Sequence, residues 1–177
     1  PFVAPLAKRA AALPASLLGP VVEMRTVARC NALIEDALAK GARLLAGGMS
    51  DSTQMRATLL DGVTREMRIW HEESFGPVKS IIRVKDETEA LAVANESEYG
   101  LSSAIYSRDS ARAWNLAQNL QTGICHINGP TVHDEAQMPF GGCKSSGYGR
   151  FGGRAGIAEF TELRWITLQT VPHELPF

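Results

Sequence analysis

The fold is decided by the stretch from Val78 to Ile127, which runs VKSIIRVKDETEALAVANESEYGLSSAIYSRDSARAWNLAQNLQTGICHI. Apolar runs at Val78–Val84, Ser102–Tyr106 and Ile124–Ile127 have the length and composition of β-strands. Helical segments of about ten residues separate these runs, and such alternation is typical of βαβ units. We therefore predict an α/β fold with a mostly parallel sheet and flanking helices. In such a sheet, functional groups lie in loops at the carboxyl ends of the strands.

Capping signals support both helices of this stretch. Asp86 and Glu89 form the ends of an Asp-x-x-Glu capping box before the first helix. Ser107 or Asp109 is placed to cap the second helix. The sequence leaves open which of these two residues is the cap.

The same pattern occurs nearer the start of the chain. Apolar residues recur there at steps of three and four, which places them on one face of a predicted helix: Val27, Cys30, Leu33, Ile34, Ala37 and Leu38. Asp36 and Lys40 can pair on the opposite side, and Gly41 is placed to end the helix. The apolar run Leu44–Ala46 predicts a short strand after it.

The last third of the chain departs from this pattern. The segment Asn128–Gly153 is long and glycine-rich, as functional loops often are. A short helix is predicted near Ala155–Phe160. The final apolar run, Leu163–Leu168, is interpreted as an edge strand that pairs with a partner subunit, because an uncovered apolar edge favours aggregation.

Composition excludes several classes of function. The chain has 177 residues, of which 45% are hydrophobic, so it can form a core. Its net charge of -1 gives no footprint for nucleic acid or for an anionic membrane, and no segment has the length of a membrane span. Three scattered cysteines do not form a disulfide framework, which favours a reducing, cytoplasmic setting. The four histidines have no metal-ligand spacing, and we predict no metal site.

One glycine pattern is misleading. Residues Gly147–Gly152 match G-x-G-x-x-G, the fingerprint of dinucleotide-binding turns. That fingerprint must follow a strand and open a helix, whereas this one follows a loop rich in proline, glycine and serine. We therefore reject it as a nucleotide site.

Two other stretches are chemically informative. Glu72–Pro77 has two adjacent carboxylates before an aromatic residue, which fits either a solvated acidic turn or a carboxylate that accepts sugar hydroxyls. Pro139–Arg150 is a loop with several glycines, in which Phe140 either lines an apolar pocket or packs on the core.

The cysteines are candidate nucleophiles by residue type alone. Cys30 lies on an apolar helix face and Cys125 within a strand, so both are expected to be buried and inert. Cys143 lies in the glycine-rich loop, where it could be exposed, but no spacing pairs it with a histidine.

Together these stretches resemble the aldehyde dehydrogenase family. Members have E-E-x-F-G-P, found here at Glu72–Pro77, and P-F-G-G-x-K-x-S-G-x-G-R, found here at Pro139–Arg150. Between them, Asn95–Ser102 resembles N-x-x-x-Y-G-L-S/A and Gly123–Asn128 resembles G-x-x-x-x-N. The segment Ile124–Glu135 is most similar to the branch that acts on aromatic aldehydes such as salicylaldehyde or vanillin.

The resemblance implies a mechanism and a set of roles. A cysteine thiolate attacks the aldehyde, hydride passes to NAD or NADP, and a glutamate-activated water hydrolyses the thioester. By match to the first motif, Glu73 holds the nicotinamide ribose hydroxyls and Phe75 packs near the nicotinamide. The substrate pocket is formed by residues of the last loop, namely Thr131, Val132, His133 and Phe140. The partners implied are a small aldehyde and identical subunits, in a dimer or tetramer.

The resemblance also implies that parts are missing. The family's nucleophilic cysteine, in a G-Q-x-C segment, is not among these residues, nor are the general-base glutamate and the oxyanion-hole asparagine. We therefore expect residues 1–162 to be a catalytic-domain portion without its first segment, and residues 163–177 to be an oligomerisation strand and tail. Relatives usually have a longer polar loop before Leu18-Gly19-Pro20. Either this loop is shortened here, or residues are absent between Ala15 and Ser16.

Three hypotheses about function follow. The chain is part of an NAD(P)-dependent aldehyde dehydrogenase and is inactive alone. Alternatively, it is a truncated, non-catalytic paralogue that assembles with full-length subunits. The third is an acylating or phosphate-using enzyme on the same fold, whose thioester passes to a thiol or to phosphate.

Overall fold

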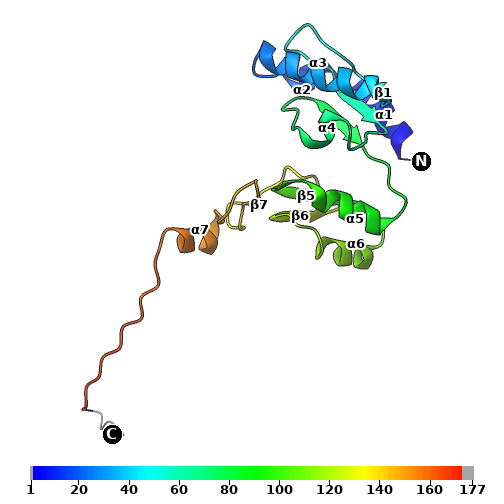
Figure 1. The fold of residues 1–177 in the computed structure, drawn as a ribbon. Helices are drawn as coiled ribbons and strands as arrows, with labels where there is room; N and C mark the ends of the chain where they lie inside the picture. The colour runs from blue at the N-terminus through cyan, green and yellow to red at the C-terminus, as the bar shows by residue number, and fades with distance from the viewer. Residues whose placement is uncertain (1, 173–177) are drawn as a thin grey trace. The chain divides into compact units, whose positions relative to one another are not determined.

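The computed structural model describes residues 2–172, which divide into two units at Glu87, residues 2–87 and 88–172 (Figure 1). The first unit contains the helices α1 (Val3–Ala12), α2 (Ala15–Leu18), α3 (Met24–Ala39) and α4 (Arg68–His71), with the strands β1 (Arg43–Ala46), β2 (Thr58–Asp61) and β3 (Val78–Ile81). Its sheet has β2 at the centre, antiparallel to β1 and parallel to β3.

Helix α3 builds the core of the first unit. The predicted apolar face is confirmed: Val27, Cys30, Leu33, Ile34 and Ala37 are all buried. Each large side chain of this kind stabilises the fold by about 1.5–3 kcal/mol when it is fully buried. The predicted Asp36–Lys40 ion pair forms at 2.6 Å on the outer side.

Strand β2 was not predicted from the sequence. All four of its residues are buried, including the carboxylate of Asp61. The charge of Asp61 is compensated by two arginines on the neighbouring segments: Arg43 Nη2 lies 2.7 Å from Oδ2, and Arg83 Nε lies 2.7 Å from Oδ1. The hydrogen bonds from Arg83, followed by those from Arg43, hold the pKa of Asp61 far below its usual range against the opposing effect of burial.

The second unit contains α5 (Glu87–Glu96), β4 (Tyr99–Gly100), β5 (Ser102–Ile105), α6 (Ser110–Ala117), β6 (Ile124–Ile127), β7 (Cys143–Lys144) and α7 (Gly153–Glu159). Strands β5 and β6 are parallel and are joined through α6, which is the predicted βαβ unit. Strands β4 and β7 form a short antiparallel pair. The α/β class is thus confirmed.

The cap of α6 is also settled. The side chain of Asp109 accepts a hydrogen bond from the backbone N–H of Arg112 at 3.0 Å, so Asp109 is the N-cap. Ser107 lies two residues earlier, and its hydroxyl accepts a hydrogen bond from the N–H of Asp109. A cap of this kind contributes about 1 kcal/mol to helix stability.

The chain after α7 is extended up to Pro172, and this described part forms no helix or strand of its own. Leu163, Trp165, Ile166 and Leu168 project from it with most of their surface exposed. Pairing with a partner subunit therefore stays a prediction, and residues 173–177 of the predicted tail lie outside the described residues. Within residues 2–172, no helix is long and apolar enough to cross a membrane.

Candidate active site

The first motif forms the loop between α4 and β3, and this loop is anchored to the core. Ser74 is buried, and its hydroxyl accepts a hydrogen bond from the N–H of Gly76 at 3.3 Å. The carbonyl of Ser74 accepts a hydrogen bond from the thiol of Cys30, 3.5 Å away on α3. Gly76 cannot be replaced freely, because a Cβ there would lie 2.5 Å from the sulfur of Cys30. The loop is therefore fixed by its backbone and its small residues.

The two adjacent carboxylates of this loop have different environments. Glu72 accepts two hydrogen bonds from the guanidinium of Arg68, at 2.7 and 3.0 Å, and this pairing lowers the pKa of Glu72. Glu73 is exposed, and its carboxylate has no hydrogen-bond or ion-pair partner within residues 2–172. Only Glu73 is therefore available to accept hydrogen bonds from the hydroxyls of a ligand.

Phe75 follows in an unusual backbone conformation. Its φ angle is 51°, in the left-handed region that a bulky residue adopts at a cost of about 1–3 kcal/mol. The ring is 69% exposed, and the guanidinium of Arg29 lies over it, 5.7 Å from the ring centroid. The loop thus places a free carboxylate and an accessible aromatic ring two residues apart, an arrangement that fits a ribose joined to a flat ring.

In the second motif, the polar residues hold the loop rather than line a cavity. Lys144 Nζ donates hydrogen bonds to the carbonyls of Asn95 and Ser97, at 2.7 and 3.0 Å, at the end of α5. Arg150 donates to the carbonyls of Gly142 and Gly149, both at 2.7 Å. These contacts give physical reasons for the lysine and the arginine of the motif.

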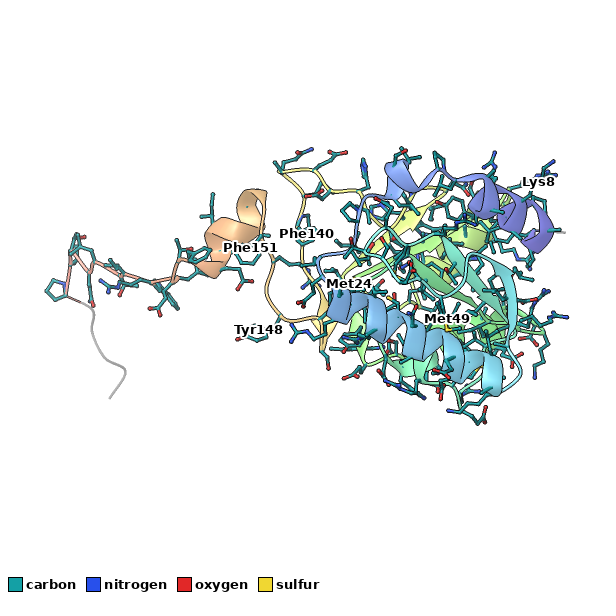
Figure 2. All side chains as sticks on the ribbon, turned by 90° about the horizontal axis from the view of Figure 1, so that it is seen from above. Lys8, Met24, Met49, Phe140, Tyr148 and Phe151 are labelled. Carbon is teal, nitrogen blue, oxygen red and sulfur yellow. The ribbon has the colours of Figure 1, made fainter. Side chains whose placement is uncertain are left out.

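Phe140 and Phe151 join the two ends of this loop. Their backbones pair through two hydrogen bonds of 2.8 and 2.7 Å. Both labelled rings lie near α7 in Figure 2, where Tyr148 points out into solvent. The loop is therefore closed at its base, while its outer part is open.

Asn128 links the ends of the two parallel strands. Its side chain accepts a hydrogen bond from the N–H of Ser107 and donates one to the carbonyl of Ser107, both at 2.9 Å. Like Phe75, it has a positive φ angle, here 58°, which asparagine tolerates well. The chain leaves β6 through this turn and enters the long loop.

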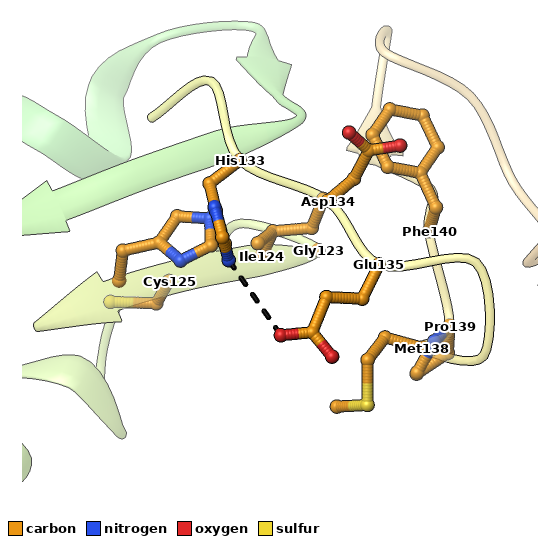
Figure 3. A pocket seen from close by; sticks show the side chains of 10 residues that line it. Gly123, Ile124, Cys125, His133, Asp134, Glu135, Met138, Pro139 and Phe140 are labelled. Atoms are coloured by element: carbon orange, nitrogen blue, oxygen red, sulfur yellow. Dashed lines mark ion pairs between the residues drawn. The ribbon is translucent and has the colours of Figure 1, made fainter. Parts of the chain in front are cut away.

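A pocket of about 420 Å³ lies between the start of β6 and this loop (Figure 3). Its volume falls in the range typical of small-molecule sites. The ten lining residues are Gly123, Ile124, Cys125, His126, His133, Asp134, Glu135, Met138, Pro139 and Phe140. This lining combines apolar walls with two histidines and two carboxylates, and it includes no lysine or arginine.

The pocket brings together two of the four residues predicted to form the substrate pocket. His133 and Phe140 line it, and Figure 3 shows His133 directed toward Glu135, 3.8 Å away. Thr131 and Val132 are not among the lining residues. The carbonyl of Thr131 instead accepts a hydrogen bond from the hydroxyl of Ser102 at 2.8 Å, and Val132 is 90% exposed.

His126 is the lining residue with the least expected environment, and it was not predicted as a site residue. Its Nε2 atom is buried and has no hydrogen-bond partner within the described residues. A buried polar atom without a partner costs about 1–3 kcal/mol. The sequence did contain a signal, since a histidine within the apolar strand Ile124–Ile127 requires a polar partner.

The cysteines show no activated nucleophile. Cys30 is fully buried, and burial raises the pKa of its thiol. The thiol of Cys143 donates a hydrogen bond to the carbonyl of Gln121 at 3.1 Å, and Cys125 lines the pocket. All three thiols are free, and no group of histidine, cysteine or acidic side chains in residues 2–172 could hold a metal ion.

The two motif loops, the βαβ unit and the pocket can now be compared with known protein families. The sequence model of the aldehyde dehydrogenase family matches residues 2–166, and the chain belongs to this family. The resemblance seen in the sequence motifs is thereby confirmed.

The relatives place the chain near enzymes named for aromatic aldehydes. It is 56% identical to vanillin dehydrogenase of Pseudomonas fluorescens over 99% of the chain, and 47% identical to salicylaldehyde dehydrogenase of Pseudomonas putida over 91% of the chain. These matches cover 38% and 33% of the two relatives, so the chain spans about a third of their length. The first match extends over 182 positions, more than the chain's 177 residues, so the relative has residues opposite gaps in this chain.

Solved structures agree with this placement. Salicylaldehyde dehydrogenase from Pseudomonas putida G7, complexed with salicylaldehyde, superposes with a TM-score of 0.93 at 44% identity, over 99% of this chain and 38% of that one. A Mycobacterium tuberculosis aldehyde dehydrogenase complexed with NAD+ gives 0.74 at 34% identity, over 81% and 30%. An NADP-dependent glyceraldehyde-3-phosphate dehydrogenase from Bacillus halodurans, complexed with NADP, also gives 0.74, at 43% identity over 78% and 29%.

Proposed function

We propose that the chain is the C-terminal catalytic-domain portion of an NAD(P)-dependent dehydrogenase that oxidises an aromatic aldehyde to its carboxylic acid. The observation that carries this proposal is the pocket beside β6. Its lining has apolar and aromatic side chains, two histidines and two carboxylates, and it includes no lysine or arginine. A substrate with a carboxylate of its own would meet Asp134 and Glu135 there, so the lining favours a neutral aromatic aldehyde over an acidic semialdehyde.

The proposed roles follow from the geometry. His133 and Phe140 contact the substrate ring directly, since both line the pocket. Thr131 and Val132 belong to the same loop and would reach the substrate from its outer part. His133 would meet the substrate ring with the edge of its imidazole, and Phe140 with its phenyl ring. Both geometries are favourable for packing against an aromatic substrate.

The cofactor would be held by the first loop. NAD or NADP supplies the hydride acceptor of the reaction when it is bound. The carboxylate of Glu73 is free to accept the ribose hydroxyls, because Arg68 occupies Glu72 instead. Phe75 presents one exposed ring next to it, held by its left-handed backbone.

Other parts of the reaction require residues outside these 177. The thioester would form on a cysteine of a G-Q-x-C segment, which this sequence does not contain. We therefore propose that the 177-residue chain is inactive alone. Within it, residues 1–162 would be a catalytic-domain portion without its first segment, and residues 163–177 would join a dimer or tetramer of identical subunits. Three free thiols fit the proposed cytoplasmic location.

A direct test compares the parent protein with the 177-residue chain. Formation of NADH or NADPH is followed with vanillin, salicylaldehyde and succinate semialdehyde as substrates. The parent should prefer the two aromatic aldehydes by at least about tenfold in kcat/KM, and the chain alone should give no turnover. Equal rates with the acidic semialdehyde would contradict the proposed substrate class, and turnover by the chain alone would contradict the proposed division of the site.

A further inference from the structure

A close backbone contact joins the start of α7 to the pocket loop. A side-chain carbon added at Gly152 would overlap the carbonyl oxygen of Met138. One added at Gly153 would overlap the carbonyl oxygen of Gln137. Backbone atoms cannot move aside as the end of a flexible side chain can, so these two positions have room only for glycine. The contact gives a physical reason for the last glycine of the pattern Gly147–Gly152, whose context does not fit a nucleotide site.

The residues that receive this contact lead into one wall of the pocket. Met138, Pro139 and Phe140 all line the cavity, and Figure 3 shows them together on one side of it. The backbone of Phe140 pairs with that of Phe151 through two hydrogen bonds of 2.8 and 2.7 Å. The wall is thus held at both of its ends by one short segment, residues 151–153.

Helix α7 fixes this segment in turn. The N–H of Gly156 donates a hydrogen bond to the carbonyl of Gly152 at 3.1 Å, which closes the first turn of the helix. At the other end of the helix, the carboxylate of Glu159 accepts a hydrogen bond from the backbone N–H of Arg150 at 3.2 Å. The segment is therefore attached to α7 from both directions, and the wall of the pocket takes its position from it.

Helix capping does not explain the glycine at the start of α7. Gly152 is the N-cap residue, a position at which serine, threonine, aspartate and asparagine are preferred because their side chains accept a backbone N–H. Gly152 provides no such side chain, and its φ angle of 89° favours glycine. The close approach of Met138 accounts for a residue that a cap alone would not select.

We infer that Gly152 and Gly153 are positioning residues, which set where the wall Met138–Phe140 lies and thereby the width of the substrate pocket. This inference rests on the proposed function, because it concerns the pocket proposed to receive the aromatic aldehyde. It adds two residues that do not line the pocket themselves. A side chain at either position would displace the wall without changing any lining residue.

The 177-residue chain labelled with ¹⁵N tests this without turnover. The backbone amide signals of Gln137, Met138 and Phe140 report the position of the wall in the absence of a ligand. Benzyl alcohol, a neutral aromatic probe without an aldehyde, then reports whether the pocket still fits a ring. Gly152→Ala should shift the three amide signals and weaken the binding of benzyl alcohol by at least about fivefold, while the signals of the first unit stay unchanged.

Two other glycines near the same helix separate the contact from backbone strain. Gly147→Ala strains a φ angle of 116°, but its Cβ would have nothing within 4 Å. Gly156→Ala lies within α7, where the Cβ would meet only the backbone of Phe151 at an ordinary 3.7 Å. Neither variant should shift the wall signals or change the Kd of benzyl alcohol by more than about twofold.

The variants can contradict the inference in three ways. Unchanged wall signals in Gly152→Ala, or equal effects in Gly147→Ala, would show that the contact does not position the wall. If Gly152→Ala loses the folded spectrum of the second unit, Gly153→Ala gives the same readout at a φ angle of 49°, which alanine tolerates better. Loss of folding in both variants would contradict a positioning role, because the contact would then serve folding alone.

Failure of the proposed function would have a different result. If benzyl alcohol shifts no signal of the pocket residues in the wild-type chain, the aromatic pocket is wrong and the proposed function fails. The wall signals recorded without a ligand still decide whether Gly152 and Gly153 position the wall.

Discussion

The loop Glu72–Pro77 and the loop Asn128–Met138 are both candidate parts of the active site, but they are built in opposite ways. The first is anchored by buried Ser74, by the thiol of Cys30 and by a glycine that has no space for a side chain. The second has exposed side chains along its whole length. The rigid first loop suits its proposed role of presenting one cofactor, whereas the second loop, proposed to set substrate range, has positions that can change at little cost in stability.

The largest expected effect concerns the sheet beneath the first loop. Asp61→Asn removes the charge that pairs with Arg43 and Arg83, and it should lower the free energy of unfolding of the first unit by about 2–3 kcal/mol at pH 7. Asp51→Asn, at an exposed carboxylate, should change it by less than about 0.5 kcal/mol. Urea unfolding, followed by a probe in each unit, measures both.

The contribution of Asp61 to stability depends on pH with a definite sign. The pKa of Asp61 is depressed in the folded chain, so its contribution is complete above the ordinary carboxyl pKa and is lost as the pH falls toward the folded value. The wild-type chain should therefore lose stability from about pH 4 downward, and Asp61→Asn should lose less over the same interval. Parallel losses in the two proteins would show that other carboxylates dominate.

A pair of glycines compares the two loops directly. Gly76→Ala places a Cβ against the buried sulfur of Cys30 and should destabilise the chain by about 1–3 kcal/mol. Gly129→Ala, in the second loop, meets only the Cβ of His126 at an ordinary 3.5 Å and should cost less than about 0.5 kcal/mol. Thermal and urea unfolding measure the stability lost in each variant. Equal losses of stability in the two variants would contradict the contrast between the loops.

The smallest effect is a gain. Phe75→Gly relieves the left-handed backbone of a residue that buries little, so stability should stay unchanged or rise by up to about 1 kcal/mol, despite loss of the contact with Arg29. Phe151→Gly is a matched control, since this exposed ring has no positive φ angle and its replacement should only destabilise. A loss of stability in Phe75→Gly as large as that in Phe151→Gly would mean that no strain is stored in the first loop.

The sequence predicted the elements whose signals are local. The face of α3, the cap Asp109 and the βαβ unit of β5, α6 and β6 all follow from periodicity and capping residues. Strand β2 was not predicted, because a strand buried on both sides shows no alternation and the partners of Asp61 lie far along the chain. The different states of Glu72 and Glu73 were predictable in part, since Arg68 precedes Glu72 by four residues.

The pocket was only half predicted for a similar reason. Phe140 was predicted from its motif and His133 from the loop Asn128–Met138, and both line the pocket. The unpaired nitrogen of His126 depends on where a distant part of the loop lies over the strand. Sequence alone gives the residue type and its strand, and it does not give the cavity that the loop creates.

Among residues 2–172, three residues other than glycine have left-handed backbones, and each lies in a different family motif: Phe75, Asn128 and Lys144. In a saturation library of this chain, these positions should be depleted first of valine, isoleucine and threonine, whatever the chemistry at the pocket, and should tolerate glycine and asparagine. Part of the family motifs is thus required by the backbone conformation and not by the chemistry of catalysis. A library designed to change substrate range is better directed at Thr131 and Val132, which have ordinary backbones.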